Sequence, residues 1–305
     1  MTNTTLRIAT RGSDLALWQA HEVQRQLTAH HPQLATELVL IHSDGDLAQT
    51  QGFDSFGYKG IFTKRIEAAL LDGRADIAVH SMKDVHSELP KSLMIAATLL
   101  REDVRDAFLS PRYSSIDALP AGATIGTASV RRSAVLRALR PDVTIVPFRG
   151  NVPTRLEKLA RGEVDATFLA VAGLKRLGLE AHITQALSYD IMLPAAAQGA
   201  VGIECRCKDE RVRELLAPLN HAPTFQAVMA ERAMLKTIDG DCHTPLCALA
   251  ELDESGQSLS LRGIWYEPDG ARRYEASIEG AATQAQALGE QAGQVLLAHK
   301  QKAGA

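Results

Sequence analysis

The sequence has few cysteines, few aromatic residues and no strong excess of charge of either sign. Its 305 residues include four cysteines and 5% aromatic residues, and the formal net charge is −3. Four cysteines in a chain of this length do not make a disulfide framework, so we expect reduced thiols. A slightly acidic composition argues against a general nucleic-acid binder, so any basic site must be local.

Long apolar runs are also missing. No stretch approaches the roughly 20 apolar residues that a membrane helix needs, and residues 1–11 lack the charged-then-apolar order of a secretory signal. We therefore expect a cytoplasmic protein without a membrane partner. With 46% hydrophobic and 23% charged residues, the composition is that of a globular protein, and the length suits two or three domains.

Alternating strand and helix patterns occupy the first two thirds of the chain. They predict strands at 6–10, 37–41 and 76–80, with helices at 14–29 and 62–73 between them. After a crossing segment at 99–105, the alternation returns with strands at 124–126, 144–148 and 166–171. This order indicates βαβ units and two similar α/β domains with mainly parallel sheets.

The last third has a different pattern. A helix at 221–238 precedes three strands at 248–252, 258–266 and 272–279, a hairpin turn at 267–270 and a closing helix, which together predict a small α+β domain. The apolar stretch 199–205 is interpreted as an extra strand of the first domain. The predicted domains are therefore 1–99 with 200–217, 105–194, and 221–305.

Basic residues follow the predicted strand ends in both α/β domains. They are Arg11, Lys83, Arg131, Arg132, Arg149 and Arg176. Open α/β sheets bind ligands at the carboxyl ends of their strands. Guanidinium groups there favour a small anionic ligand with several carboxylates or phosphates. The alternative is a set of scattered surface cations.

Two further residues stand out by their position. Asp84 follows Lys83 in a strand-end turn, where a carboxylate can stabilise a developing positive charge or exchange protons, or can simply cap a helix or pair with the lysine. Cys242 lies in a turn between Gly240 and Pro245. Its thiol could be a nucleophile, an anchor, or a metal ligand together with the residues Cys205, Cys207, His243 and Cys247. Their spacing is not that of a usual zinc site, so we expect no metal.

Many separate motifs, in the right order along nearly the whole chain, resemble those of the porphobilinogen deaminase family. They are Arg7–Arg11 with Ser13, Asp76–Asp84, Arg101–Asp103 with Arg105–Phe108, Arg131–Arg132, Arg149–Leu156, Gly173–Gly178, Gln198–Arg206 and Cys242–Pro245. The resemblance implies two domains similar to type II periplasmic binding proteins and a third domain. In the third domain, the residue that matches Cys242 is joined by a thioether to a dipyrromethane cofactor.

The resemblance also implies an activity. The family deaminates four porphobilinogen molecules, joins them in succession to the dipyrromethane primer, and then releases hydroxymethylbilane by hydrolysis, with ammonia as the other product. Asp84 matches the aspartate that stabilises the cationic azafulvene formed as ammonia leaves. Two other readings stay open: a non-catalytic protein that binds small carboxylates, and a catalytically weakened member of the family.

The site residues implied by the resemblance fall into three overlapping groups. The catalytic group is Asp84, Lys83, Arg11, Arg149 and Arg155. The cofactor-binding group is Cys242, Ser13, Lys83, Asp84, Ser129, Arg131, Arg132 and Arg149. The substrate-binding group is Arg11, Ser13, Lys59, Phe62, Arg149, Arg155, Arg176 and Gln198. We further expect a monomer with porphobilinogen as its small-molecule partner.

The chain departs from the family pattern near the expected site. The positions are Asp14, Asp44, Ser55, Tyr58, Arg65, His86, Asp241 and Cys247. Three of them fall in the polar, glycine-rich loop 42–60, which is a candidate active-site lid. We expect these changes to affect turnover and loop closure more than the chemistry.

Overall fold

The computed structural model describes residues 5–41, 63–241 and 243–304. Within it the chain forms two compact units, one of residues 1–102 with 200–225 and one of residues 103–199 with 226–305. The predicted loop 42–60 and the site residues Lys59, Phe62 and Cys242 lie outside the described residues.

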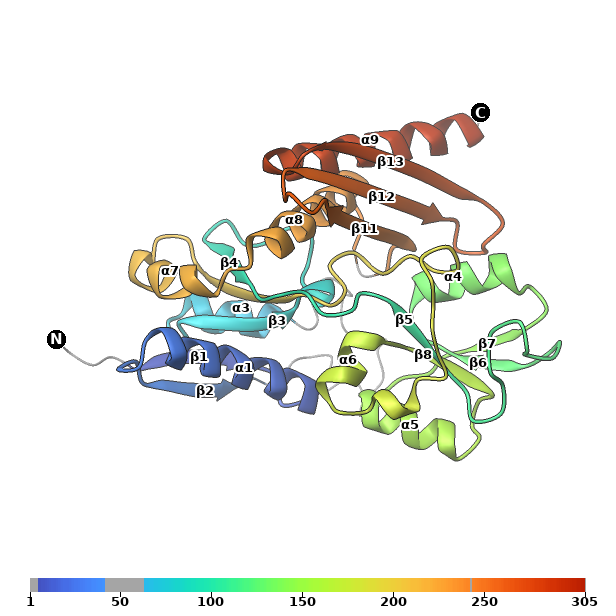
Figure 1. The fold of residues 1–305 in the computed structure, drawn as a ribbon, viewed down its shortest axis with the longest axis horizontal. Helices are drawn as coiled ribbons and strands as arrows, with labels where there is room; N and C mark the ends of the chain where they lie inside the picture. The colour runs from blue at the N-terminus through green and yellow to red at the C-terminus, as the bar shows by residue number, and fades with distance from the viewer. Residues whose placement is uncertain (1–4, 42–62, 242, 305) are drawn as a thin grey trace. The chain divides into compact units, whose positions relative to one another are not determined.

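The first unit is built on a five-stranded sheet in the order β2-β1-β3-β10-β4. Figure 1 labels β1, β2, β3 and β4 of this sheet. Its strands are β1 (Leu6–Thr10), β2 (Thr36–Leu40), β3 (Ile77–Ser81), β4 (Leu93–Thr98) and β10 (Val201–Arg206). The pairings β1–β2 and β1–β3 are parallel, while β10 is antiparallel to both β3 and β4. One reversed strand therefore sits among four that point the same way.

Helices cover both faces of this sheet. On one face α1 (Asp14–His30) packs Ala20, Val23 and Leu27 against strand residues such as Ile8. On the other face α3 (Lys64–Leu71) packs Ile66 and other apolar side chains in a second cluster. The short helices η2 (Met82–Asp84), α7 (Glu210–Leu216) and η4 (Ala217–Leu219) complete the unit. Burial on both faces explains why the central strand β3 is largely apolar, while the edge strand β2 carries Thr36 and Glu37.

The sheet of the second unit repeats the same plan, in the order β7-β6-β8-β5-β9. Its strands are β5 (Asp106–Leu109), β6 (Thr124–Gly126), β7 (Thr144–Val146), β8 (Ala166–Ala170) and β9 (Gln185–Ala186). Here β5 is the reversed strand. The helices are α4 (Val130–Leu139), α5 (Val152–Ala160), α6 (Val171–Arg176) and η3 (Glu180–His182). The predicted likeness of the two α/β halves is confirmed.

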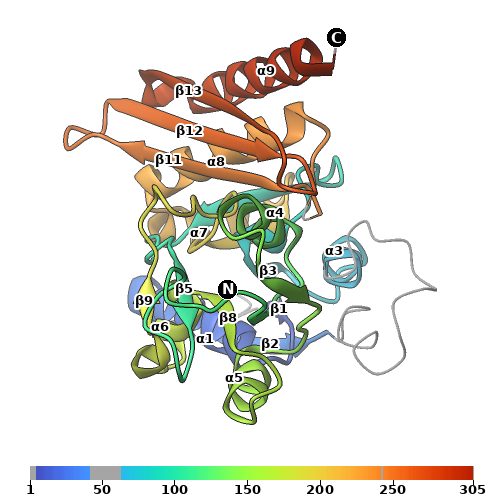
Figure 2. The ribbon, with the colours of Figure 1, turned by 90° about the vertical axis from the view of Figure 1, so that its right-hand side faces the viewer.

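The C-terminal part is an antiparallel sheet with two helices against it. Figure 2 shows β11 (Leu246–Leu252), β12 (Ser258–Tyr266) and β13 (Arg273–Ala281) side by side, with α9 (Ala285–Gly304) along them. Residues of α8 (Ala222–Thr237) and α9 share a core with this sheet, and η5 (Ala282–Gln284) leads into α9. Cys247, Leu249 and Tyr266 instead join the core that contains Phe108 and Leu136. Residues 103–199 and the C-terminal sheet thus share one core.

The predicted class, α/β with mainly parallel sheets and a small α+β part, is confirmed. The division into three domains remains a prediction. The second and third predicted domains lie in one compact unit, and residues from both pack in the same hydrophobic core. The sequence pattern did not reveal β4, β5, β9 or α7; of these, β9 has only two residues and β5 begins with the charged Asp106. None of the helices among the described residues is long and apolar enough to cross a membrane.

Candidate functional site

A pocket opens in the first unit at the carboxyl ends of β1 and β3. It is lined by Arg11, Ser13, Leu15, Ala16, Gln19, Thr63, Val79, His80, Ser81 and Asp84. The structure therefore brings together three of the predicted site residues, Arg11, Ser13 and Asp84. This is the strand edge at which ligands bind in α/β sheets.

The start of α1 fixes two of these residues. Arg11 follows β1 directly, and Ser13 is the N-cap residue of α1, where its side-chain oxygen accepts a hydrogen bond from the N–H of Ala16 at 3.4 Å. Gln19 is buried and donates a hydrogen bond to Ser81 Oγ at 2.8 Å, which ties the helix to the end of β3. The positive end of a helix dipole and a guanidinium thus lie beside the pocket.

The turn after β3 presents Asp84. In η2 the side chain of Met82 is buried, Lys83 is half-buried and Asp84 is exposed. The N–H of Met82 donates to the carbonyl of Ala200 at 3.0 Å. A Cβ at Gly202 would collide with Met82 Sδ, so the glycine leaves the space that Met82 occupies. The buried methionine therefore anchors the turn that holds the carboxylate at the pocket.

Sequence reasoning missed a buried acidic cluster behind the pocket. His80 Nε2 lies 2.9 Å from Glu204 Oε2, and the Glu204 side chain is 0% exposed. Glu67 of α3 is also buried; burial raises its pKa, and the charge of Glu204 raises it further. His80 and Glu204 lie in apolar strands and in two of the family motifs, but the sequence did not indicate that they meet.

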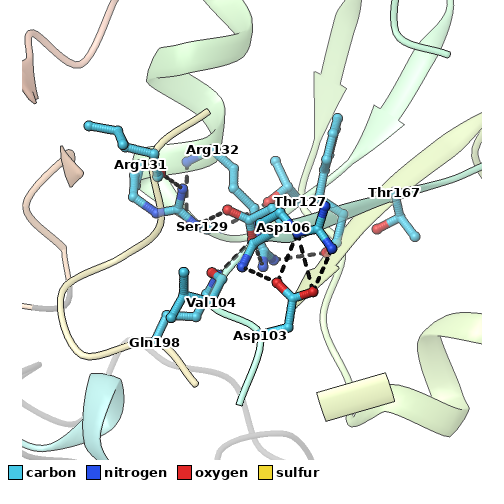
Figure 3. A network of polar contacts seen from close by, with 12 residues as sticks. Asp103, Val104, Asp106, Thr127, Ser129, Arg131, Arg132, Thr167 and Gln198 are labelled. Carbon is cyan, nitrogen blue, oxygen red and sulfur yellow. Dashed lines mark hydrogen bonds and ion pairs between the residues drawn. The ribbon is translucent and has the colours of Figure 1, made fainter. Parts of the chain in front are cut away.

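The second unit buries Arg131 and Arg132, which the sequence places at a strand end as cations for a ligand. Both lie in the first turn of α4 and are buried, at 4% and 5% exposure, around the fully buried Asp106 (Figure 3). Arg131 Nη2 donates to Asp106 Oδ2 at 2.7 Å. Arg132 donates to Oδ1 from Nε at 3.0 Å and from Nη2 at 2.6 Å. The two arginines therefore have an internal counter-ion, which sequence reasoning did not identify.

The ionisation of Asp106 follows from these contacts. Burial alone would raise its pKa, but the charges of Arg131 and Arg132 and their hydrogen bonds lower the pKa to about 2. Arg131 Nη1 also donates to the carbonyl of Leu193, and Arg132 Nη1 to that of Phe168. Two positive side chains around one negative one leave a buried positive charge. The chemistry of this cluster suits a further anion.

Ser129 and Gln198 belong to the same network. Ser129 is the N-cap residue of α4, and its Oγ accepts from the N–H of Arg132 at 3.4 Å. Gln198 Nε2 donates to the carbonyl of Val104 at 2.7 Å and to Asp106 Oδ1 at 3.3 Å. Gln198 is buried, and these two hydrogen bonds tie it to Val104 and Asp106. Its contact with substrate stays a prediction.

The remaining predicted cations lie at two other turns of the second unit. Arg149 is exposed at the end of the segment after β7, and Gly150 follows it with φ +128°. Arg155 Nε donates to the carbonyl of Gly150 at 2.7 Å, and a Cβ at Gly150 would lie 2.9 Å from Thr154 Cγ2. Arg176, at the end of α6 rather than directly after a strand, donates to the carbonyl of Gly199 at 2.7 Å.

The described cysteines are not placed as reactive groups. Cys205 and Cys247 are buried, and burial raises the pKa of each thiol to about 11. Cys207 is half-buried and is likewise not in a disulfide. Among residues 5–41, 63–241 and 243–304, no group of three or more histidine, cysteine, aspartate or glutamate side chains lies close enough to hold a metal ion. The structure gives no placement for Cys242.

In each of the two units, the cationic side chains are suited to binding the carboxylates of a ligand. In the first unit Arg11 and the α1 N-terminus lie at the pocket with Asp84. In the second, Arg131 Nε is a buried donor with no nitrogen or oxygen acceptor among the described residues, and the guanidinium neighbours the thiol of Cys247. The pocket carboxylate and the buried cationic pair are therefore suited to proton exchange and to anion binding, respectively.

Two family descriptions match this chain. "Porphobilinogen deaminase, dipyromethane cofactor binding domain" matches residues 6–214. "Porphobilinogen deaminase, C-terminal domain" matches residues 225–298. The two matches lie one after the other and together extend over most of the sequence, including every predicted site residue.

Solved structures similar to the chain include periplasmic proteins. The periplasmic VFT2 domain of BvgS from Bordetella pertussis is 15% identical, with a TM-score of 0.44, and the match covers 70% of this chain and 85% of that chain. A putative methionine-binding lipoprotein from Bacillus subtilis is 15% identical, with a TM-score of 0.45, 72% of this chain and 92% of that chain. Likenesses at this level carry no conclusion about function.

Proposed function

Because the chain belongs to the porphobilinogen deaminase family, a family of transferases in tetrapyrrole biosynthesis, we propose that it is a hydroxymethylbilane synthase (EC 2.5.1.61) whose site residues act as set out below. The observation that carries the proposal is the match of the two family descriptions over residues 6–214 and 225–298. The reaction joins four porphobilinogen molecules head to tail with loss of ammonia, and ends with hydrolytic release of hydroxymethylbilane.

The cofactor of this family is dipyrromethane, which supplies the primer to which the substrate units are added. We assign its covalent attachment to Cys242. Its acetate and propionate groups require fixed cations and hydrogen-bond donors, for which we assign Ser13, Lys83, Ser129, Arg131, Arg132 and Arg149. The buried Nε of Arg131 and the capping position of Ser129 support this assignment.

Asp84 is the group that we assign to proton and charge handling at the reacting carbon. Its exposed carboxylate lines the pocket beside Arg11, and the buried Met82 holds its turn in place. A carboxylate in this position stabilises positive charge that develops as ammonia leaves the substrate, and it can hold the proton lost when the new bond forms. Lys83 and Arg11 complete this catalytic group with Arg149 and Arg155.

Substrate carboxylates need further cations. For these we assign Arg11, Ser13, Arg149, Arg155, Arg176, Gln198, Lys59 and Phe62, of which the last two lie outside the described residues. The hydrogen bonds of Arg155 to Gly150 and of Arg176 to Gly199 each use one nitrogen of a guanidinium that carries five N–H donors.

The proposal is tested by product formation. Purified protein is incubated with porphobilinogen, and the release of ammonia and of a linear tetrapyrrole is followed, with Asp84→Asn as the matched control. We expect four ammonia molecules per tetrapyrrole from the wild type, and turnover lower by roughly 10²-fold or more from the variant. Binding of porphobilinogen without ammonia release would instead identify a non-catalytic carboxylate-binding protein.

We also propose that the protein is a cytoplasmic monomer, as the resemblance to the family implies. Size-exclusion chromatography with light scattering tests the oligomeric state, and a mass near twice that of the chain would contradict it. Cell fractionation tests the location.

A further inference from the structure

Asp106 is a buried charge that the family roles assigned above do not use. It starts β5, its side chain is 0% exposed, and it accepts hydrogen bonds from Arg131, Arg132 and Gln198. The two arginines come from the first turn of α4, 25 and 26 residues later in the chain. A carboxylate in this position joins β5 to the start of α4 (Figure 3).

The hydrogen bonds hold the two guanidinium groups unequally. Arg132 uses Nε and Nη2 for Asp106 and Nη1 for the carbonyl of Phe168, so all three of its nitrogens are engaged. Arg131 uses Nη2 for Asp106 and Nη1 for the carbonyl of Leu193. Its buried Nε donates to no nitrogen or oxygen acceptor among the described residues, and the thiol of Cys247 is a further hydrogen-bonding neighbour of this guanidinium. A thiol is a weak acceptor, so an added carboxylate would be a stronger partner for this N–H.

The charge count leads to the same conclusion. Asp106 is ionised at neutral pH because its pKa is about 2, so the three side chains carry two positive charges and one negative charge. The thiol of Cys247 neighbours Arg131, but its pKa of about 11 keeps it neutral, and a neutral thiol is only a weak acceptor. One buried positive charge remains for an external anion.

We propose that Asp106 is a positioning residue for cofactor loading. It neutralises one of the two guanidinium charges and fixes both groups before the cofactor arrives, so that one carboxylate of the dipyrromethane completes the cluster at Arg131. The inference rests on the proposed function. Asp106 itself touches no cofactor, because its two oxygens are occupied by the arginines and Gln198. Preorganisation of this kind lowers the cost of binding.

The first unit offers a matched control. Asp76 also lies between two arginines: it accepts from Arg7 Nη2 at 2.8 Å and from Arg206 Nη2 at 3.3 Å. No cofactor role is assigned to any of these three residues. Asp76→Asn and Asp106→Asn therefore remove the same charge from similar ion pairs, one outside the proposed cofactor site and one inside it.

The test is the rate of cofactor loading. Apoprotein from cells that cannot make porphobilinogen is mixed with porphobilinogen, and the intact mass of the folded fraction is followed over time. We expect Asp76→Asn to load within about twofold of the wild type and Asp106→Asn to load at least about tenfold more slowly, a factor that corresponds to roughly 1.4 kcal/mol. Loading of Asp106→Asn at the wild-type rate would overturn the inference. Failure of the wild type to load would instead refute the proposed function.

A second measurement uses the wild-type apoprotein and a conservative variant in place of Asp106→Asn. In wild-type apoprotein labelled with ¹⁵N-arginine, the Nε–H of Arg132 should exchange slowly with solvent because it is buried and bonded to Asp106. We expect a protected Nε–H signal that disappears in Arg132→Lys. If no protected signal is lost in that variant, the pair is not fixed before loading, and the inference fails.

Discussion

Replacement of Asp106 by asparagine should destabilise the second unit in a way that depends on pH. Asparagine keeps the size of the side chain and removes its charge. The pKa of Asp106 falls from 3.8 in the unfolded chain to about 2 in the fold. Since one pKa unit corresponds to 1.36 kcal/mol, the ionised carboxylate contributes about 2 kcal/mol at neutral pH.

The sign of the pH dependence follows from the depressed pKa. A carboxyl group whose folded pKa lies below its unfolded pKa stabilises the fold above the unfolded value, and this contribution is lost as the pH falls through the folded value. The difference in the free energy of unfolding between wild type and Asp106→Asn should therefore have its full value at pH 7. It should shrink to about half at pH 3 and approach zero only below about pH 2.

The two tryptophans allow the units to be followed separately. Trp18 lies in α1 of the first unit and Trp265 in β12 of the second. In a Trp18→Phe background, the fluorescence of Trp265 reports urea unfolding of the second unit alone. Asp76→Asn in a Trp265→Phe background is the control for the first unit. The reasoning would be refuted if Asp106→Asn lowers the free energy of unfolding of the second unit by less than about 0.5 kcal/mol at pH 7, or by the same amount at pH 7 and pH 3.

Three further predictions concern the site. Asp84→Ala should keep the cofactor and lose roughly 10²–10⁴-fold in turnover; near-normal turnover with full cofactor occupancy by mass would refute its catalytic role. Arg149→Leu should impair cofactor assembly, because an exposed cation for carboxylates is lost; a variant with full occupancy and normal kinetics would count against it. Gly202→Ala should collide with Met82, cost about 1–3 kcal/mol and lower turnover by displacing the Asp84 turn. Met82→Ala combined with Gly202→Ala should relieve the collision, and a double variant no more stable than Gly202→Ala would contradict this account of the turn.

Much of the fold was predictable because its signals are local. Ser13 and Ser129 precede helices and cap them, and glycine follows Arg149 at a positive φ. The stretch 199–205 was interpreted as a strand that returns to the first domain, and β10 confirms it. These features depend on short-range periodicity, capping and turn chemistry, which a single sequence carries.

The partners of the charged residues were not predictable in the same way. His80 and Glu204 are 124 residues apart, and Arg131 and Asp106 are 25 apart, so only the fold brings them together. From sequence, Arg131 and Arg132 were counted as ligand cations like Arg149. Burial separates them: Arg149 is exposed, while the pair lies in the interior with Asp106. Asp106 lies in the motif Arg105–Phe108, but nothing in that motif indicated that its partners are Arg131 and Arg132.

The most direct test of the account is the mass of the purified protein, followed by peptide mapping. We predict a covalent addition equal to two porphobilinogen units after loss of ammonia, located on the peptide that contains Cys242 and absent from Cys242→Ser. A protein that has only its polypeptide mass, even after incubation with porphobilinogen, would contradict the account. So would an addition that maps to Cys205, Cys207 or Cys247.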